Sequence, residues 1–381
     1  MRQRTMRAAS MAQVADMANL SAAWQAVRRK HGSEGLDGVS IRDFQAAVET
    51  HLGQMQQALC THTYQPGALK RVTLAKPDHR QRLIGVPTVA DRIVQHAILN
   101  VLEPHFEPGF CPCSYGFRPG RSAHQAVHAV ADGLQEGLSW VVEADLQDFF
   151  DTLDWTILRQ QLATVVHDPP LLTLIQHFLQ AGALRGHNAP LVEQGTPQGA
   201  VLSPLFSNVY LTPFDRLMLA RGYRLIRYAD DFLTLHRTRD AAVAAWQCMR
   251  DVLEGQLHLR LHGEKTRITD ARRQAVDFLS FRFHKGTVLP TPQAVERFQN
   301  RVQAIITAQR AQGSAALATQ LNPLIRGWGE YFKIGQVAPL YQQLDAWLAA
   351  QLDVPPGPAS GVASLAALYA RYQTRHQEKP L

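Results

Sequence analysis

Tyr228-Ala229-Asp230-Asp231 is the stretch that decides the fold of this 381-residue chain. Hydrophobic runs at positions 225–226 and 232–235 flank the two aspartates, and both have the length and alternation of short strands. The sequence therefore predicts a tight hairpin with two carboxylates at its turn. Because adjacent carboxylates repel each other, they are typical of a divalent-cation site, and such hard oxygen ligands suit Mg²⁺ or Mn²⁺. For an arbitrary Asp-Asp pair the alternative is a solvated acidic turn, so the rest of the chain has to decide.

Composition places the chain among globular proteins. With 46% hydrophobic and 19% charged residues, it is long enough for about two or three packed units. The formal charge of +7 is compatible with a polyanionic partner. Most of the positive charge is arginine, which suits contacts to phosphate, but a GC-rich genome gives the same arginine-rich composition. The four cysteines have no spacing typical of zinc, and no run of about eighteen apolar residues exists. We therefore expect a reduced cytoplasmic protein without a membrane segment.

The order of predicted elements does not follow a repeated β-α-β pattern. Long gaps separate the strands, which favours an α+β fold with an antiparallel sheet backed by helices. Residues 292–352 are almost wholly helical in pattern, and a proline-rich break at 355–358 precedes a tail with room for one helix. Residues 1–20 have the character of a loosely packed lead-in. Strands are predicted at 71–74, 81–86, 139–144 and 277–283, and helices at 20–29, 41–59, 90–102, 202–220 and 241–257.

A third acid follows another predicted strand. Asp145 stands where the strand at 139–144 ends, a usual position for a metal ligand on a sheet. With Asp230 it supplies carboxylates from two strands, enough to hold two Mg²⁺ ions about 4 Å apart. Such a pair of ions lowers the pKa of an attacking 3′-hydroxyl and neutralises a leaving pyrophosphate. The alternative is that Asp145 only caps the next segment.

A glycine-rich loop from Gln194 to Gly199 precedes the helix at 202–220, and its glycines allow the backbone to approach a ligand closely. Alone this loop is weak evidence, but it is one of several motifs in a fixed order. Together they resemble the reverse transcriptases of bacterial group II introns and their relatives, over roughly residues 20–350. The motifs are Lys76-Pro77-Asp78, 82–88, Asp91-Arg92, 114–122, the strand ending at Asp145, 194–199, 228–231, 264–266 and 278–281.

The resemblance implies a right-hand polymerase with an antiparallel-sheet palm, fingers and a helical thumb. It places an N-terminal extension at 1–20, fingers and palm at 21–287, a maturase-like thumb at 288–352, and a proline-rich break with a short tail at 353–381. The implied activity is RNA-directed DNA polymerisation from a primer 3′-hydroxyl by a two-magnesium mechanism, in which Mn²⁺ can substitute. The implied partners are an RNA template, a DNA or RNA primer, and dNTPs, and a dedicated structured RNA is a further candidate.

The resemblance also assigns the metal site. Asp145 and Asp230 match the two metal-binding aspartates, and Asp231 matches a supporting third carboxylate. The Leu146 carbonyl is expected to complete one of the two sites.

Four residues match positions that contact the incoming nucleotide. Phe150 matches the bulky side chain that excludes a ribose 2′-hydroxyl and so selects deoxynucleotides, and Gln198 matches a nucleotide-contacting glutamine. Lys76 and Arg82 are expected to grip the triphosphate. Core packing of Phe150 and a solvated Lys76 are the alternatives.

Contacts to template or primer are expected from four further residues, Arg118, Arg121, Tyr228 and Lys265. Two aromatic residues of the 114–122 motif, Tyr115 and Phe117, are expected to pack. The aromatic residues of 292–352 match the thumb helices that grip the template–primer duplex, and they also have the spacing of a helical core.

The chain departs from the family pattern in three places. His79 and Leu83 replace an expected glycine and proline, and the strongly basic run expected after Trp347 is missing. The DNA-binding and His-Asn-His endonuclease regions of many intron proteins are also not found. Three functions therefore stay open: a group II intron reverse transcriptase, a non-enzymatic RNA-binding maturase that aids splicing, and a domesticated reverse transcriptase in antiphage defence, CRISPR spacer acquisition or DNA repair. The oligomeric state stays unknown.

Overall fold

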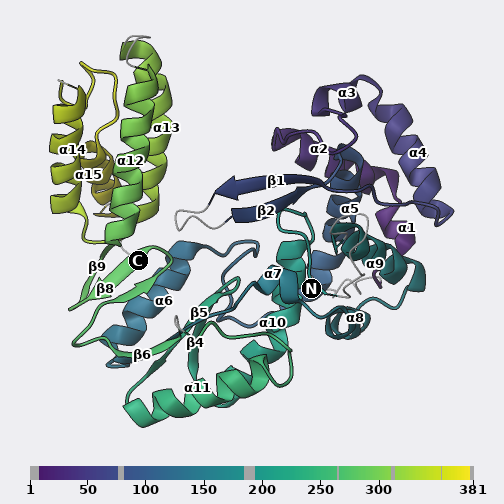
Figure 1. Ribbon diagram of the computed structural model, residues 1–381, viewed down its shortest axis with the longest axis horizontal. Coiled ribbons are helices and arrows are strands. Elements are labelled where there is room, and N and C mark those ends of the chain that lie inside the picture. The colour runs from purple at the N-terminus through teal and green to yellow at the C-terminus, as the bar shows by residue number, and fades with distance from the viewer. Residues whose placement is uncertain are drawn as a thin grey trace. The chain divides into compact units, whose positions relative to one another are not determined.

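The computed structural model describes residues 8–75, 81–183, 194–263, 266–309, 314–352 and 354–377 of the chain (Figure 1). The regular elements of these residues are helices and short strands, with antiparallel pairing in the hairpins, which confirms the α+β class. Contacts divide the chain into two compact units. The first consists of Met1–Arg121, Glu143–Leu233 and Val243–Arg267, and the second of Ser122–Val142, Thr234–Ala242 and Ile268–Leu381.

The N-terminal part of the first unit is helical. The expectation of a loosely packed lead-in is wrong for residues 8–20, because Ala9, Met11 and Val14 are buried. The single helix predicted at 41–59 is also wrong, since Ala47 leaves the helical backbone with φ −135° and ψ 36° and divides it in two. The helices are α1 (Met11–Val14), α2 (Met17–Arg29), α3 (Ile41–Ala46), α4 (Val48–Cys60) and α5 (Val89–Phe106).

A two-stranded hairpin precedes α5. Its strands β1 (Lys70–Ala75) and β2 (Gln81–Val86) pair antiparallel, from Lys70 opposite Val86 to Ala75 opposite Gln81. This confirms the hairpin predicted at 71–86. The residues that join the two strands, 76–80, lie outside the described part of the chain.

A four-stranded sheet has the order β4-β5-β3-β6. Its strands are β3 (Trp140–Asp145), β4 (Arg224–Tyr228), β5 (Asp231–His236) and β6 (Arg267–Asp270). The predicted hairpin at 228–231 is confirmed, because β4 and β5 are neighbours joined by Ala229 and Asp230. The strand predicted to end near Asp145 is confirmed as β3.

Helices precede and follow the strands of this sheet along the chain. Helix α10, labelled in Figure 1, begins after the glycine-rich loop. It packs against β4 and is buried along most of its length. The short helix α7 starts four residues after Asp145, where Asp148 adopts a left-handed φ of 48°. The elements are η1 (Glu107–Gly109), α6 (Ala123–Gln135), α7 (Phe149–Thr152), α8 (Trp155–Ala163), α9 (Pro169–Ala183), α10 (Ser203–Ala220) and α11 (Arg239–Leu253).

The C-terminal part of the second unit is a small sheet followed by helices. The sheet consists of β7 (Val276–Phe278), β8 (Phe281–His284) and β9 (Thr287–Pro290). A continuous strand predicted at 277–283 is wrong, because Leu279 and Ser280 take left-handed φ values of 51° and 65° and turn the chain between β7 and β8. The helices predicted at 292–352 and in the tail are confirmed as α12 (Pro292–Gln309), α13 (Ser314–Phe332), α14 (Ala338–Leu352) and α15 (Leu365–Gln377).

Aromatic side chains form the core of these helices. The Trp328 ring stacks on Phe298 at a centroid distance of 4.7 Å and lies 4.7 Å from Phe332. Asp345 on α14 accepts hydrogen bonds from the Leu365 and Ala366 amides at 2.9 Å each and so caps α15. The C-terminal helix is therefore part of this bundle. Among the described helices, none combines the length and apolar character required to cross a bilayer.

Candidate active site

The turn between β4 and β5 carries the two adjacent acids. Ala229 is buried and takes a left-handed φ of 58°, which makes the turn tight. Asp230 is half-buried and Asp231 is exposed. In the sheet order, β5, which begins at Asp231, lies beside β3, which ends at Asp145. The sheet thus brings the strands that carry the three predicted metal-binding acids next to one another.

A fully buried ion pair supports this turn. Arg227, the residue before Tyr228, donates from Nε to Asp215 Oδ1 at 2.7 Å and from Nη2 to Asp215 Oδ2 at 2.6 Å. Its Nη1 donates to the Ala229 carbonyl at 2.9 Å and to Asn208 Oδ1 at 3.1 Å. Because Asp215 and Asn208 both belong to α10, the guanidinium joins the turn to a buried helix through hydrogen bonds.

Burial disfavours both charges of this pair, and the attraction between the two side chains opposes the effect of burial. Burial raises the pKa of the Asp215 carboxyl, and the charge and hydrogen bonds of Arg227 oppose that rise. Burial also works against the Arg227 charge, but Asp215 holds the pKa of the guanidinium above its ordinary value. Each member therefore depends on the other, and loss of either leaves an uncompensated polar group in the core.

The 114–122 motif packs against the same turn. Ser114 forms a parallel bridge with Arg227, and the Tyr115 amide donates to the Arg227 carbonyl at 2.8 Å. Gly116 lies so close that an added Cβ would stand 2.3 Å from the Ala229 nitrogen. Only glycine leaves room for the backbone of the turn at this position.

Two neighbouring side chains of the motif differ from expectation. Arg118 is only 9% exposed: its Nη1 donates to the Cys111 and Ser114 carbonyls at 2.7 and 2.8 Å, and its Nη2 pairs with Glu107 at 2.7 Å. Phe117, expected to pack, is 48% exposed. The predicted template contact of Arg118 is therefore corrected, because its guanidinium is buried and bonded within the loop. The expected packing of Phe117 is only partial, because about half of this residue is exposed.

The remaining predicted template and primer residues are only partly placed. The Arg121 guanidinium lies over the Tyr115 ring at 5.6 Å, and its side chain is half-buried. Tyr228 is half-buried at the end of β4. Lys265 lies outside the described residues.

The chain after β3 pairs with residues 260–262. The His262 amide donates to the Asp145 carbonyl, and the Gln147 amide donates to the Arg260 carbonyl, both at 2.8 Å. The pairing is centred on Leu146, but neither bond uses the Leu146 carbonyl, to which the family resemblance assigns a metal contact. The backbone at Asp145 is therefore hydrogen-bonded to His262, and its strand β3 has β5 as a neighbour in the sheet.

The predicted nucleotide residues lie on a connected set of loops. The Thr196 amide donates to the Phe150 carbonyl at 2.6 Å, and the half-buried Phe150 ring lies edge-on to Phe149 at 5.2 Å. The Gln198 carbonyl accepts from the Gly85 amide at 3.0 Å, and its side-chain amide lies 3.5 Å from Asp151. The structure thus brings Phe150, Gln198 and β2 together.

Two further predicted residues cannot be placed. Lys76 lies outside the described residues. Arg82 lies on β2 opposite Leu74, and its side chain is outside what the structure describes.

Several residues that shape the site were missed by sequence analysis. The turn is supported by three of them, Arg227, Asp215 and Asn208. A fourth, buried Gln95, accepts a hydrogen bond from the Val201 amide at 2.9 Å, directly after the glycine-rich loop. An arginine that directly follows the apolar pair Leu225-Ile226 and precedes the acidic turn is the one available signal, because a charge at such a position needs a partner. Nothing in the sequence identifies Asp215 as that partner.

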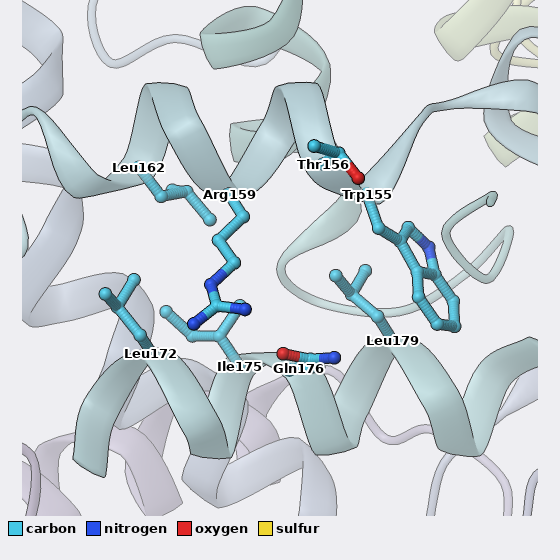
Figure 2. Close-up of a pocket in the computed structure, with 8 residues that line it drawn as sticks. All are labelled: Trp155, Thr156, Arg159, Leu162, Leu172, Ile175, Gln176 and Leu179. Carbon is cyan, nitrogen blue, oxygen red and sulfur yellow. The ribbon is translucent and has the colours of Figure 1, made fainter. Parts of the chain in front are cut away.

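A cavity of about 150 Å³ between α8 and α9 is separate from these residues (Figure 2). In Figure 2, Arg159 and Gln176 lie between the two helices, with leucine side chains around them. Trp155, which lines it, donates from Nε1 to the Gly195 carbonyl at 2.7 Å. The cavity has none of the predicted site residues in its lining, so we do not assign it to the active site.

The donor chemistry of the acidic turn fits a divalent cation. Three carboxylates on neighbouring strands are hard oxygen donors of the kind that Mg²⁺ and Mn²⁺ prefer. In the part of the chain that the structure describes, however, no three acidic, imidazole or thiol side chains are already arranged as a cation cage. The joint role of Asp145, Asp230 and Asp231 stays a prediction.

Comparison with known proteins agrees with this geometry. Residues 74–283 match the family described as reverse transcriptase (RNA-dependent DNA polymerase). Protein YkfC of Escherichia coli (strain K12) is 32% identical over 336 residues, which cover 78% of this chain and 86% of that protein. The chain belongs to the reverse transcriptase family. It therefore has the family's right-hand polymerase fold, its RNA-directed DNA polymerase activity with a divalent metal ion, and an RNA template as a partner.

The group II lineage is also established. Residues 295–353 of this reverse transcriptase match the maturase-specific domain of group II introns. The group II intron-encoded protein LtrA of Lactococcus lactis subsp. cremoris is 34% identical over 187 residues, which cover 49% of this chain and 31% of LtrA. One chain of a solved partial Cas6-RT-Cas1–Cas2 complex is 28% identical to this chain, with a TM-score of 0.38. The match covers 64% of this chain and 42% of the matched chain.

Proposed function

We propose that this reverse transcriptase extends a primer 3′-hydroxyl with dNTPs on an RNA template by using two Mg²⁺ ions held by Asp145 and Asp230. Asp231 supports the site, the Leu146 carbonyl completes it, and Mn²⁺ can replace Mg²⁺. The observation that carries the proposal is the sheet order, in which β3, ending at Asp145, lies beside β5, beginning at Asp231. When bound, such ions activate the attacking hydroxyl and neutralise the charge on the leaving pyrophosphate.

The remaining residues position the reactants. Phe150 forms a wall against a ribose 2′-hydroxyl, and its carbonyl is fixed by the Thr196 amide. Gln198 contacts the incoming nucleotide, while Lys76 and Arg82 on the β1–β2 hairpin bind its triphosphate. The bond between the Gly85 amide and the Gln198 carbonyl supports this division, because it joins the hairpin to the glycine-rich loop. Positioning and charge stabilisation are the principal means of catalysis in phosphoryl transfer.

The proposal also assigns the parts of the chain. Residues 21–287 form fingers and palm, and residues 288–352 form the thumb that holds the template–primer duplex. Residues 1–20 form an N-terminal extension, and residues 353–381 form a proline-rich break and a short tail. Arg121, Tyr228 and Lys265 contact template or primer, whereas the burial of Arg118 gives it a structural role.

Primer extension on an RNA template tests the proposal. Asp230→Asn removes one carboxylate charge at nearly constant volume, and we expect a loss of more than about 1000-fold in Mg²⁺-dependent dNTP incorporation. Asp251→Asn, at a side chain that is 71% exposed, is the matched control and should retain full activity. A folded Asp230→Asn protein that incorporates dNTPs at the original rate contradicts the metal assignment.

A maturase role is the second candidate, because residues 295–353 match the maturase-specific domain. A protein that only stabilises intron RNA has no need of Asp230, so Asp230→Asn should then support splicing as well as the original chain. If splicing is undetectable with either protein, while primer extension is robust, the maturase role is excluded.

A third candidate keeps the polymerase chemistry and changes its biological use. A free-standing enzyme could serve antiphage defence, CRISPR spacer acquisition or DNA repair with a dedicated structured RNA. Sequencing the RNA and DNA that copurify with the protein distinguishes these uses. An intron transcript favours the intron role, and a recurrent noncoding or CRISPR-derived RNA favours a domesticated one.

A further inference from the structure

Phe117 is an exposed ring beside the catalytic turn. In the described part of the chain it is the only phenylalanine or tryptophan that is exposed, at 48%. Its ring centroid lies 6.3 Å from that of Tyr228, the residue two before Asp230. A single exposed apolar side chain is common on protein surfaces, so exposure alone decides nothing.

The backbone of Phe117 gives the second observation. Its φ of 57° lies in the left-handed region, which a bulky aromatic residue adopts only at a cost in free energy. Glycine fits that conformation without strain, and Gly116 and Gly120 stand nearby in the same motif. Stability therefore does not account for the aromatic side chain at this position, because the ring is not in the core.

Contacts of the residues before and after Phe117 fix its left-handed backbone conformation. Before Phe117, the Tyr115 amide bonds to the Arg227 carbonyl, and Gly116 lies against the Ala229 backbone. After it, Arg118 is anchored by the carbonyls of Cys111 and Ser114. A strained residue held this firmly next to reacting groups is a recognised feature of functional sites.

We infer that Phe117 is a primer-binding residue whose ring, together with Tyr228, packs against a base or sugar of the primer strand near its 3′ end. The inference rests on the proposed function, since the strand nearest the acidic turn is the one whose 3′-hydroxyl reacts. Aromatic rings bind nucleic acid in this way without regard to sequence, because every nucleotide offers an apolar face.

Duplex binding by Phe117→Gly tests the inference. The substitution removes the ring and relieves the left-handed strain, so the thermal midpoint of unfolding should stay equal or rise. The Kd for a primer–RNA template duplex, measured by fluorescence anisotropy with Mg²⁺ and without dNTP, should increase about 5- to 100-fold. The slope of log Kd against log salt should not change, because no phosphate contact is lost. Phe117→Trp should restore binding.

Leu36→Gly is the control, because Leu36 is a 62% exposed apolar residue outside the site, and duplex binding should be unchanged. Unchanged binding by a folded Phe117→Gly protein overturns the inference, and so does a changed salt slope or a failure of Phe117→Trp to restore affinity. These outcomes concern duplex affinity alone. Failure of the original chain to incorporate dNTPs instead refutes the proposed two-ion polymerase mechanism, so the two failures are distinguishable.

Discussion

Arg227 and Asp215 form a bidentate ion pair, with 2.6 Å between Nη2 and Oδ2, that is fully buried behind the acidic turn. The pair connects β4 to α10, and the same guanidinium binds the Ala229 carbonyl at 2.9 Å. It therefore has two separable roles, one in the stability of the core and one in the position of Asp230. Isolated removal of either charge is costly, whereas replacement of both by apolar residues can be nearly neutral.

The first prediction separates these roles. Arg227→Met should lower the free energy of unfolding by about 3–5 kcal/mol, because Asp215 is left as an uncompensated buried charge. The double variant Arg227→Met with Asp215→Leu should recover most of that stability, as measured by denaturant unfolding. It should still polymerise at least about tenfold more slowly and require more Mg²⁺, since the Ala229 carbonyl has lost its donor. Full recovery of both rate and Mg²⁺ dependence would assign the pair to stability alone.

Gly116→Ala should disturb the acidic turn directly. The added Cβ would stand 2.3 Å from the Ala229 nitrogen, so the turn or the 114–122 loop has to move. We expect a loss of about 10- to 100-fold in primer extension, because displacements of about 1 Å have effects of that size on catalysis. Gly53→Ala, in helix α4 with open space around it, should leave activity unchanged and raise stability slightly. Equal activity of the two variants would show that the close contact is unimportant.

Phe150→Val should relax the selection of the sugar. Removal of the ring opens the space in which a ribose 2′-hydroxyl would lie, while the backbone bond from Thr196 to residue 150 is kept. The ratio of kcat/KM for a ribonucleotide to that for the matching deoxynucleotide should rise at least about tenfold. The same change at Phe149, whose ring is buried, should reduce stability without changing this ratio. An unchanged ratio in Phe150→Val excludes a steric role for the ring.

Acid pH should destabilise the protein through buried His96. Burial lowers the pKa of His96 from 6.5 to about 4. The folded state therefore keeps the neutral ring while the unfolded state binds a proton below about pH 6.5, so the stability contribution is full above that pH and is lost as the pH falls towards 4. At pH 5 the loss from this residue should be about 2 kcal/mol relative to pH 8.

Denaturant unfolding at both pH values measures this effect. His96→Gln cannot titrate, and the difference between pH 8 and pH 5 should shrink by that amount. If the original chain and His96→Gln lose equal stability on acidification, His96 does not carry the effect. His236, whose pKa burial also lowers to about 4, is the next residue to substitute in that case.

Much of the fold and of the acid placement could be predicted because it is local in sequence. The β4–β5 hairpin, the end of β3 at Asp145 and the C-terminal helices follow from alternation and helical periodicity over a few residues. The turn at Leu279-Ser280 was missed because neither of the two left-handed positions is a glycine, and a single serine within an alternating pattern is a weak turn signal.

The supporting contacts could not be predicted because they join distant positions. Arg227 and Asp215 lie twelve residues apart on a strand and a helix, and only the packing of α10 on β4 brings them together. The burial of Arg118 and the exposure of Phe117 could not be predicted either, because residue type alone predicts the opposite burial. The carbonyls and the carboxylate that bind the Arg118 guanidinium come from Cys111, Ser114 and Glu107, and nothing in the sequence identifies them as its partners.

The most direct test of the two-ion account is single-turnover dNTP incorporation on an RNA template as a function of Mg²⁺ concentration, for Asp145→Asn and Asp230→Asn. Mn²⁺ binding to each protein, followed by electron paramagnetic resonance without substrate, gives an independent readout. The account predicts that each variant loses more than about 1000-fold in rate and also loses Mn²⁺ affinity, because both carboxylates hold the same pair of ions. A folded variant of either aspartate that keeps its rate within about tenfold and binds Mn²⁺ as the original chain does would contradict it.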